Sequence, residues 1–326
     1  MPNTILVTGG AGYIGSHVVK QLADTDAKVV VLDDLSTGFE KSVLAGTFVH
    51  GQVGDYELVC KLLRDYQIKT VIHFAAHTIV PESVSDPLKY YGNNTCATRS
   101  LLAACQACDV EHFIFSSTAA VYGVPADPEC TEETPTIPIN PYGTSKLMSE
   151  MMLRDLGAAS LLRYTILRYF NVAGADPKGR IGQSTKQATL LTKVAVEVAL
   201  GKRDSLKIFG TDYDTPDGTG VRDYIHVEDL ASAHLDALRY LQAGGQSTTV
   251  NAGYGHGYSV REVIAMVEKV AGVTLKIDEV ARRAGDPPKL IARCNKIKKT
   301  LGWQPKYDNL EAIVRSAYEW ERKLNR

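Results

Sequence analysis

The sequence predicts an α/β protein in which a doubly wound parallel sheet is combined with a smaller C-terminal α+β domain. Apolar runs of strand length alternate with helical segments over roughly the first 170 residues, and this alternation is typical of βαβ units. Beyond Gly174 the chain is interrupted by Gly, Asp and Pro, as in 175–179 and 211–220. These interruptions indicate a smaller and less regular second unit.

The expected elements follow one another in the order that such a sheet requires. Strands are expected at 4–8, 28–33, 46–49, 70–74, 112–116 and 163–169, and helices near 13–23, 56–66, 94–108 and 142–157. We assign 1–175 to a Rossmann-type domain, with some segments of about 223–251 returning to it, and 176–326 to the second domain.

The first strand leads into a glycine-rich turn. Gly9, Gly12 and Gly15 are spaced three apart between the apolar run 4–8 and a helical stretch. Glycines at this spacing permit a tight turn, a close approach of the backbone to a pyrophosphate, and close packing of the helix on the strand. A second apolar run ends at Asp33, whose carboxylate can accept hydrogen bonds from ribose hydroxyls and would repel a 2′-phosphate. The pattern predicts an NAD site.

Tyr142 and Lys146 are four residues apart in a segment expected to be helical, so their side chains share one face. A nearby ammonium favours the phenolate and should lower the pKa of Tyr142 from about 10 toward the range of a general base. The run 113–123 is a strand that ends in hydroxyl residues, and open α/β sheets hold ligands at the carboxyl ends of their strands. We therefore expect Thr118 to hydrogen-bond the same substrate oxygen as Tyr142.

Composition excludes several classes of protein. The 326 residues suit one large or two modest domains, and a net charge of −1 gives no reason to expect nucleic acid or a membrane surface as partner. No apolar run approaches the ~20 residues of a membrane span. The N-terminus leads directly into a strand, so no signal peptide is expected. Six cysteines in a chain of this length are expected to be reduced thiols. A cytoplasmic protein is expected.

Four longer strings carry a resemblance to a known family. They lie at 90–94 (YYGNN), 167–174 (LRYFNVAG), 217–227 (DGTGVRDYIHV) and 282–287 (RRAGDP). With the three motifs above, they make the chain similar, nearly end to end, to the extended short-chain dehydrogenase/reductases. Within these, it resembles the UDP-glucose (UDP-galactose) 4-epimerase family.

The resemblance implies a set of residues around NAD. It places the glycine-rich loop at the phosphates and Lys146 at the nicotinamide ribose. Gln52 stands where family members often carry an Asp that contacts the adenine, and Thr78 replaces a lysine near the cofactor. The implied cofactor-binding residues are Gly9, Gly12, Tyr13, Ile14, Gly15, Asp33, Gln52, Val53, Phe74, Ala75, Asn94 and Lys146.

The resemblance also implies residues for a UDP-sugar. Arg222 and Arg283 match the diphosphate, because guanidinium groups pair well with its oxygens. Asn171 would donate an amide hydrogen bond and Phe209 would flank the uracil. The remaining implied positions are Asp286 at the ribose, Thr189 where members have Asn or His, and Leu290 where members that exclude N-acetylated sugars have a large aromatic residue.

The implied activity is epimerisation at C4 of the sugar, with Tyr142 as base, Thr118 assisting it, NAD as cofactor and no metal. His73, His77 and His226 are interpreted as structural. A 4,6-dehydratase would need an acid pair after Thr118 and a related decarboxylase a Glu in that stretch, but Ala119 follows. The alternatives are a 4-epimerase of UDP-N-acetylhexosamine or UDP-pentose and, from another class, a non-catalytic NAD-binding regulator. The family's pairing of the helices near 94–108 and 142–157 implies a homodimer.

Overall fold

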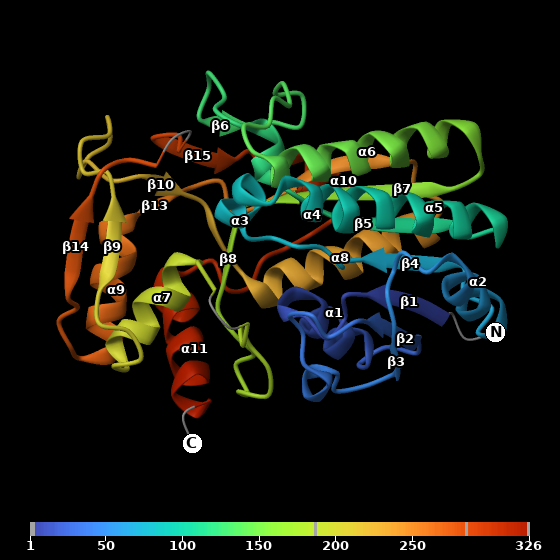
Figure 1. Cartoon of the computed structure of the whole chain (residues 1–326), viewed down its shortest axis with the longest axis horizontal. Helices are drawn as coiled ribbons and strands as arrows, with labels where there is room; N and C mark the ends of the chain where they lie inside the picture. The colour runs from blue at the N-terminus through green and yellow to red at the C-terminus, as the bar shows by residue number, and fades with distance from the viewer. Residues whose placement is uncertain (1–3, 186–187, 284–285, 325–326) are drawn as a thin grey trace.

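The largest sheet has seven parallel strands and lies in one half of the molecule, on the right in Figure 1. The computed structural model describes residues 4–185, 188–283 and 286–324. The strand order is β12-β7-β5-β4-β1-β2-β3, so the chain begins in the middle and winds outward in both directions. The strands are β1 (Thr4–Thr8), β2 (Lys28–Asp33), β3 (Thr47–His50), β4 (Thr70–His73), β5 (His112–Thr118), β7 (Arg163–Tyr169) and β12 (Thr248–Ala252).

Helices cover both faces of this sheet, as its alternating side chains require. In β1, Ile5 and Val7 belong to one buried cluster and Leu6 to another on the opposite face. The first cluster includes side chains of α1 (Tyr13–Leu22) and α8 (Val227–Gln242). The second includes side chains of α2 (Tyr56–Asp65), α5 (Ala97–Ala107) and α6 (Pro141–Ala159).

The prediction of an α/β fold with a doubly wound parallel sheet is confirmed. Strands β1, β2 and β7 have the expected limits, whereas β5 extends two residues further, to Thr118. The helix expected at 94–108 is wrong at its start. A π-helical segment, η2 (Tyr91–Cys96), follows the short helices α3 (Val80–Ser85) and α4 (Pro87–Tyr90), and regular α-helix begins only at Ala97. Such wide turns are common where a helix carries functional residues.

The rest of the chain builds three small sheets beside the large one. One late strand, β12, belongs to the large sheet and pairs with β7 from Thr248 to Ala252. The small sheets contain β13 (Tyr258–Ser259), β10 (Val221–Arg222), β15 (Lys289–Ala292) and β6 (Glu129–Cys130); β11 (Tyr224–His226) with β8 (Asn171–Ala173); and β14 (Ile277–Val280) with β9 (Leu206–Phe209). The helices are α7 (Leu191–Ala199), α9 (Val260–Ala271), α10 (Asn295–Leu301) and α11 (Leu310–Lys323), and short 3₁₀ turns occur at η1 (Glu40–Ser42) and η3 (Ala119–Tyr122).

A buried ionic cluster fastens α1 to the second part of the chain. The Lys20 ammonium lies 2.9 Å from a carboxylate oxygen of Asp176 and also binds Glu228 at the start of α8. Burial tends to raise the pKa of Glu228, but hydrogen bonds and charges from His17 and Lys20 outweigh it and lower that pKa to about 2. The helix that follows the glycine-rich loop is therefore bound to two later segments of the chain, at Asp176 and at Glu228.

None of the helices in the described residues combines the length and apolar character needed to cross a membrane. No group of three or more His, Cys, Asp or Glu side chains in the same residues is arranged to hold a metal ion.

Candidate functional site

The glycine-rich loop has the shape that the sequence predicted. Gly9 has a φ of +71°, and a Cβ there would lie 2.5 Å from the backbone nitrogen of Ala75. A Cβ on Gly15 would lie 2.3 Å from the carbonyl oxygen of Gly9. Gly12 caps α1 without a side-chain hydrogen bond, and a Cβ there would meet only the Gly9 oxygen, at 3.2 Å. The amides and dipole of the helix N-terminus that follows suit a pyrophosphate, so the loop fits a dinucleotide.

Asp33 lies at the carboxyl end of β2, beside this loop. One carboxylate oxygen accepts the backbone N–H of Ala11 at 2.9 Å, and the other accepts that of Leu35 at 2.8 Å. Burial raises the pKa of Asp33, while these two hydrogen bonds act in the opposite direction. Asp33 thus anchors the loop as well as presenting oxygens at the expected ribose position.

The other expected cofactor residues follow the neighbouring strands. Phe74 and Ala75 come directly after β4, and the backbone N–H of Phe74 donates to the Thr8 carbonyl at 2.9 Å. After β3, Val53 is buried but Gln52 is exposed. The Gln52 side chain therefore lies at the protein surface. Its implied contact with the adenine stays a prediction.

Asn94 has a larger structural role than the resemblance implied. Its side-chain amide donates to the Ser145 hydroxyl and to the His77 carbonyl, both at 3.0 Å. Its amide oxygen accepts the His77 backbone N–H at 2.8 Å. The π-helical segment that carries Asn94 is thus joined to α6 next to Lys146.

Helix α6 and strand β5 bring the three expected catalytic side chains together. The Asn140 side chain caps the helix by accepting the Gly143 N–H at 2.9 Å. Tyr142 and Lys146 are both buried and lie one turn apart on the face that packs against β5. Thr118 is the last residue of β5 and hydrogen-bonds the Tyr142 side chain.

The expected lowering of the Tyr142 pKa is wrong for the protein alone. Burial raises the pKa of Tyr142, and the hydrogen bond with Thr118 offsets only part of this rise. Burial also lowers the pKa of Lys146 to about 7, against an opposing contribution from Glu150. In an apolar site both groups favour their neutral forms, and this desolvation outweighs the mutual attraction that the spacing suggested.

Four of the residues expected to hold the substrate lie on β8, β10 and β15 or in the loop before β15. The register places Arg222 opposite Leu290 in the parallel pair β10–β15. Asn171 donates its backbone N–H to the Asp223 carbonyl at 2.9 Å. The Arg222 guanidinium lies 3.5 Å from a carboxylate oxygen of Asp286. Asn171, Arg222 and the pair Asp286 and Leu290 therefore come from three segments that are far apart in the sequence.

Arg283 is placed differently from Arg222. Its guanidinium carbon lies 3.6 Å from the ring centre of Phe209, at the end of β9, so the two predicted residues stack on one another. Ala284 and Gly285 of the same string lie outside the described residues. Thr189 is exposed just before α7, and among the described residues no hydrogen bond of its side chain supports its predicted role.

Sequence reasoning missed two buried acids next to the site. Glu150 lies one turn beyond Lys146 on α6, and the four-residue spacing of Tyr142, Lys146 and Glu150 could have revealed it. The Asp223 carboxylate accepts the backbone N–H groups of Tyr254, Gly255 and Ala292. Only the fold brings those three amides together, so spacing in the sequence gives no signal for Asp223.

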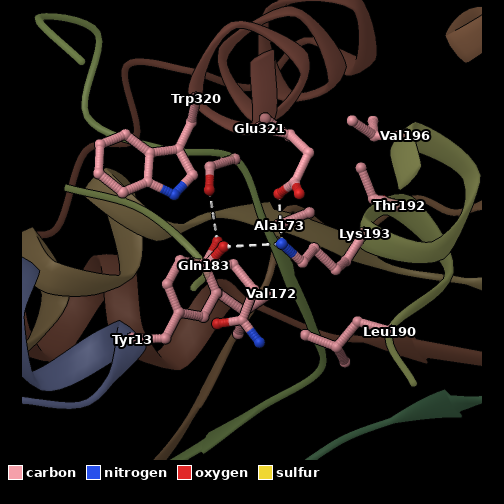
Figure 2. Close-up of a pocket in the computed structure, with 12 residues that line it drawn as sticks. Tyr13, Val172, Ala173, Gln183, Leu190, Thr192, Lys193, Val196, Trp320 and Glu321 are labelled. Atoms are coloured by element: carbon pink, nitrogen blue, oxygen red, sulfur yellow. Dashed lines mark hydrogen bonds and ion pairs between the residues drawn. The ribbon is translucent and has the colours of Figure 1, made fainter. Parts of the chain in front are cut away.

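A small cavity lies beside Tyr13, the residue that follows Gly12 of the glycine-rich loop. Figure 2 shows Tyr13, whose hydroxyl donates to the Gly174 carbonyl at 2.6 Å, next to side chains of α7 and α11. The Lys193 ammonium donates to the Gln183 carbonyl at 3.2 Å and pairs with Glu321. The cavity volume is about 20 Å³, room for a water-sized molecule but far too small for a nucleotide sugar.

Comparison with known proteins identifies the family. Residues 5–253 match the model of the NAD dependent epimerase/dehydratase family. The chain belongs to this family. A UDP-glucose 4-epimerase of Azospirillum brasilense is 55% identical over 321 residues, which cover 98% of this chain and 92% of that protein.

Two solved structures of members of this family are similar over almost the whole chain. A UDP-glucose 4-epimerase from Brucella ovis in complex with NAD is 45% identical, with a TM-score of 0.95, over 97% of this chain and 98% of that chain. A UDP-Glc/GlcNAc 4-epimerase from Campylobacter jejuni is 50% identical, with a TM-score of 0.87, over 98% of this chain and 99% of that chain.

Proposed function

We propose that this member of the NAD dependent epimerase/dehydratase family is a UDP-glucose 4-epimerase, which interconverts UDP-glucose and UDP-galactose with NAD as cofactor. The observation that carries the proposal is the buried group of Thr118, Tyr142 and Lys146 at the carboxyl end of the sheet. Relatives with this name extend over the full chain.

The cofactor is held by the first half of the chain. The amides of the glycine-rich loop and the N-terminus of α1, with Tyr13 and Ile14, would bind the pyrophosphate, and Asp33 would bind the adenosine ribose. We assign Gln52, Val53, Phe74, Ala75 and Asn94 to the lining of the NAD site and Lys146 to the nicotinamide ribose. When bound, NAD supplies reversible hydride transfer at C4, so that the sugar passes through a 4-keto form.

The chain's own residues move the proton and hold the sugar nucleotide. Tyr142 takes the proton of the 4-hydroxyl and returns it, and Thr118 steadies the same oxygen. Burial raises the pKa of Tyr142, and a charged Lys146 on the same helix face would favour its phenolate. The structure of the site excludes bulk water, because all three side chains are nearly buried.

The diphosphate acts as the pivot on which the keto sugar presents its other face. Arg222 and Arg283 would bind it, since guanidinium groups pair with phosphate oxygens in two-pronged fashion. Phe209 would flank the uracil and Asp286 would accept from the uridine ribose, in exchange for their present contacts with the two arginines. Asn171 and Thr189 complete the proposed set.

The deciding experiment uses the protein as purified, without added cofactor. We expect bound NAD to be released on denaturation, and UDP-galactose to be converted to an equilibrium mixture with UDP-glucose. A matched sample stripped of NAD should be inactive until NAD is restored. Strict dependence on external NAD with accumulation of NADH would indicate a dehydrogenase, and bound NAD without any turnover would indicate the non-catalytic regulator.

A second candidate substrate class is the UDP-N-acetylhexosamines. It is favoured by Leu290, which lies beside Arg222 and is smaller than the aromatic residue that narrows the pocket in restrictive family members. The Campylobacter jejuni relative also carries UDP-Glc/GlcNAc in its name. UDP-pentoses lack the C6 group and would fit the same pocket. We propose strong activity on the plain hexoses and weaker activity on their N-acetyl forms.

The substitution Leu290→Tyr should selectively suppress turnover of the N-acetylated sugars. Pocket shape discriminates a small group by about 1–3 kcal/mol, or roughly 10- to 200-fold in kcat/KM. The comparison is kcat/KM for UDP-galactose against UDP-N-acetylgalactosamine, with Leu290→Met as a control of similar volume. Equal loss on both substrates would show that Leu290 does not gate the pocket.

We also propose that the protein is a homodimer formed through α5 and α6. These helices pack side by side (Figure 1), and Met148 and Met151 expose 40% and 53% of their surface on α6. Leu88 on the neighbouring α4 is 78% exposed, so apolar surface continues past the helix pair.

Sedimentation at micromolar concentration should give the mass of two chains. Met151→Arg should shift the mass toward that of one chain, because it buries a charge in the interface. The control Val273→Arg changes an exposed apolar residue in the loop after α9 and should leave the mass unchanged. A single-chain mass for the unaltered protein would refute the assembly.

The division of the chain follows the same logic. We propose an NAD-binding domain over 1–175, with segments of about 223–251 returning to it, and a nucleotide-sugar-binding domain over 176–326. The pairing of β12 with β7 supports the return.

All six cysteines are free thiols, which supports the proposed cytoplasmic location.

A further inference from the structure

We propose that Glu150 is a positioning residue for the reaction: its carboxylate, fixed by Arg168, is the buried counter-charge that keeps the Lys146 ammonium charged beside Tyr142. The inference rests on the proposed epimerase function. It concerns a residue that no motif singled out and that lies outside the groups expected to touch cofactor or sugar.

The geometry places the three side chains in one line. Tyr142, Lys146 and Glu150 are buried and follow one another at four-residue spacing along α6. Beneath them, Phe115 and Ser117 lie two residues apart on β5 and so point to the same face. The Lys146 ammonium is 4.5 Å from the ring centre of Phe115, and the Ser117 hydroxyl donates to Glu150 at 2.5 Å.

The Glu150 carboxylate is fixed in place by hydrogen bonds from two arginines. Arg168, opposite Ser117 in the β5–β7 register, donates from Nε at 3.0 Å and from Nη2 at 2.6 Å. Arg154 donates to the same carboxylate at 2.6 Å from a partly exposed position. Arg168 and Glu150 are both almost fully buried, so their charges are weakly screened by water.

Glu150 supplies the negative charge that balances the Lys146 ammonium. On α6 it is faced by Tyr142 and Glu150, and from β4 by His73, whose pKa burial lowers to about 3, so that His73 is neutral. Tyr90 on α4 lies edge-on to Tyr142, and Tyr169 ends β7 opposite Thr118. Burial raises the pKa of both tyrosines, so that they are neutral as well. The contribution that opposes desolvation of the Lys146 ammonium comes from Glu150.

Removing this carboxylate has a defined electrostatic consequence. The ammonium of a lysine exists below its pKa and is lost as the pH rises through it. Burial already lowers the pKa of Lys146 to about 7, so loss of Glu150 would move the loss of charge to a still lower pH. Arg168 would then remain as an uncompensated neighbouring cation and add to the effect. Removing Arg168 together with Glu150 should therefore restore part of the shift.

The test compares pH profiles of kcat for Glu150→Gln, for the double variant Glu150→Gln/Arg168→Met, and for the control Arg154→Gln. In Glu150→Gln the alkaline limb should move down by at least about one pH unit, so that turnover above the limb falls about tenfold. The double variant should lie between Glu150→Gln and the unaltered protein, and the limb of Arg154→Gln should not move down. KM should change little in all three.

A second measurement reports on Lys146 without turnover. The protein labelled with ¹³C at lysine Cε is titrated by NMR, and the Lys146 signal is assigned by its absence in Lys146→Met. Its pKa should follow the same order as the kinetic limbs, with the unaltered protein highest and Glu150→Gln lowest.

Three results would overturn the proposal. They are equal loss of kcat at every pH, an unshifted alkaline limb, or an unshifted NMR titration, because a merely structural role predicts each of them. If Glu150→Gln does not fold, the double variant retains the test, since it removes a buried ion pair as a unit. If the unaltered protein does not epimerise, the proposed function fails, and the NMR titration still decides whether Glu150 holds the charge of Lys146.

Discussion

Tyr142→Phe should lower kcat by about 10²–10⁴-fold while NAD and the UDP-sugar remain bound, because only the ionisable oxygen of the general base is lost. The ring keeps its packing, including the edge-on contact with Tyr90 at 6.4 Å between ring centres. Steady-state kinetics on UDP-galactose gives kcat, and calorimetric titration with UDP-glucose gives the affinity.

Thr118→Ala provides the matched comparison for Tyr142→Phe. Its hydroxyl hydrogen-bonds Tyr142 and helps to counter the raised pKa of the phenol, but it does not ionise. The loss of kcat should therefore be smaller than for Tyr142→Phe. Turnover close to that of the unaltered protein in Tyr142→Phe would assign the base to another residue.

Gly15→Ala should abolish NAD binding and lower the free energy of unfolding by about 1–3 kcal/mol, the usual cost of overpacking. The added Cβ would lie 2.3 Å from the Gly9 carbonyl oxygen, so α1 must move away from the loop that receives the pyrophosphate. Urea titration gives the free energy of unfolding, and the absorbance of the purified protein gives its NAD content.

The control for Gly15→Ala is Gly92→Ala. Gly92 lies in the helical segment η2, and a Cβ there would meet no atom within 4 Å. Because alanine restricts the unfolded chain, this change should be neutral or slightly stabilising. If Gly15→Ala retained NAD and full stability, the close approach of loop and helix would not be what binds the dinucleotide.

Local patterns in the sequence were enough to predict the strands of the large sheet up to β7 and the glycine-rich loop, but not β12. The strand at 28–33, the spacing of the glycines and the acid at Asp33 all report on contacts made within one βαβ unit. The spacing of Tyr142 and Lys146 likewise predicts a shared helix face, which the structure has. The family resemblance supplied the proposed substrate residues, since Asn171, Arg222 and Leu290 come from separate strands that only the fold brings together.

The predictions that were wrong, and the residue that was missed, depend on contacts between segments far apart in the chain or on depth of burial. The direction of the Tyr142 pKa depends on how deeply the helix is buried, and spacing along the chain does not contain that depth. The π-helical segment before α5 depends on bonds from Asn94 to His77 and Ser145, which belong to other elements. Glu150 was missed although its spacing was regular, because its importance depends on the partner Arg168 on a strand formed later in the chain.

The late arrival of β12 affects how the chain can be synthesised and folded. Its partner β7 ends at Tyr169, but β12 begins only at Thr248, after the segments that build the smaller sheets. Until the ribosome has released that strand, the edge of β7 has open backbone groups. The large sheet is therefore completed after most of the chain has emerged, and its slow, long-range closure leaves the nascent protein open to aggregation.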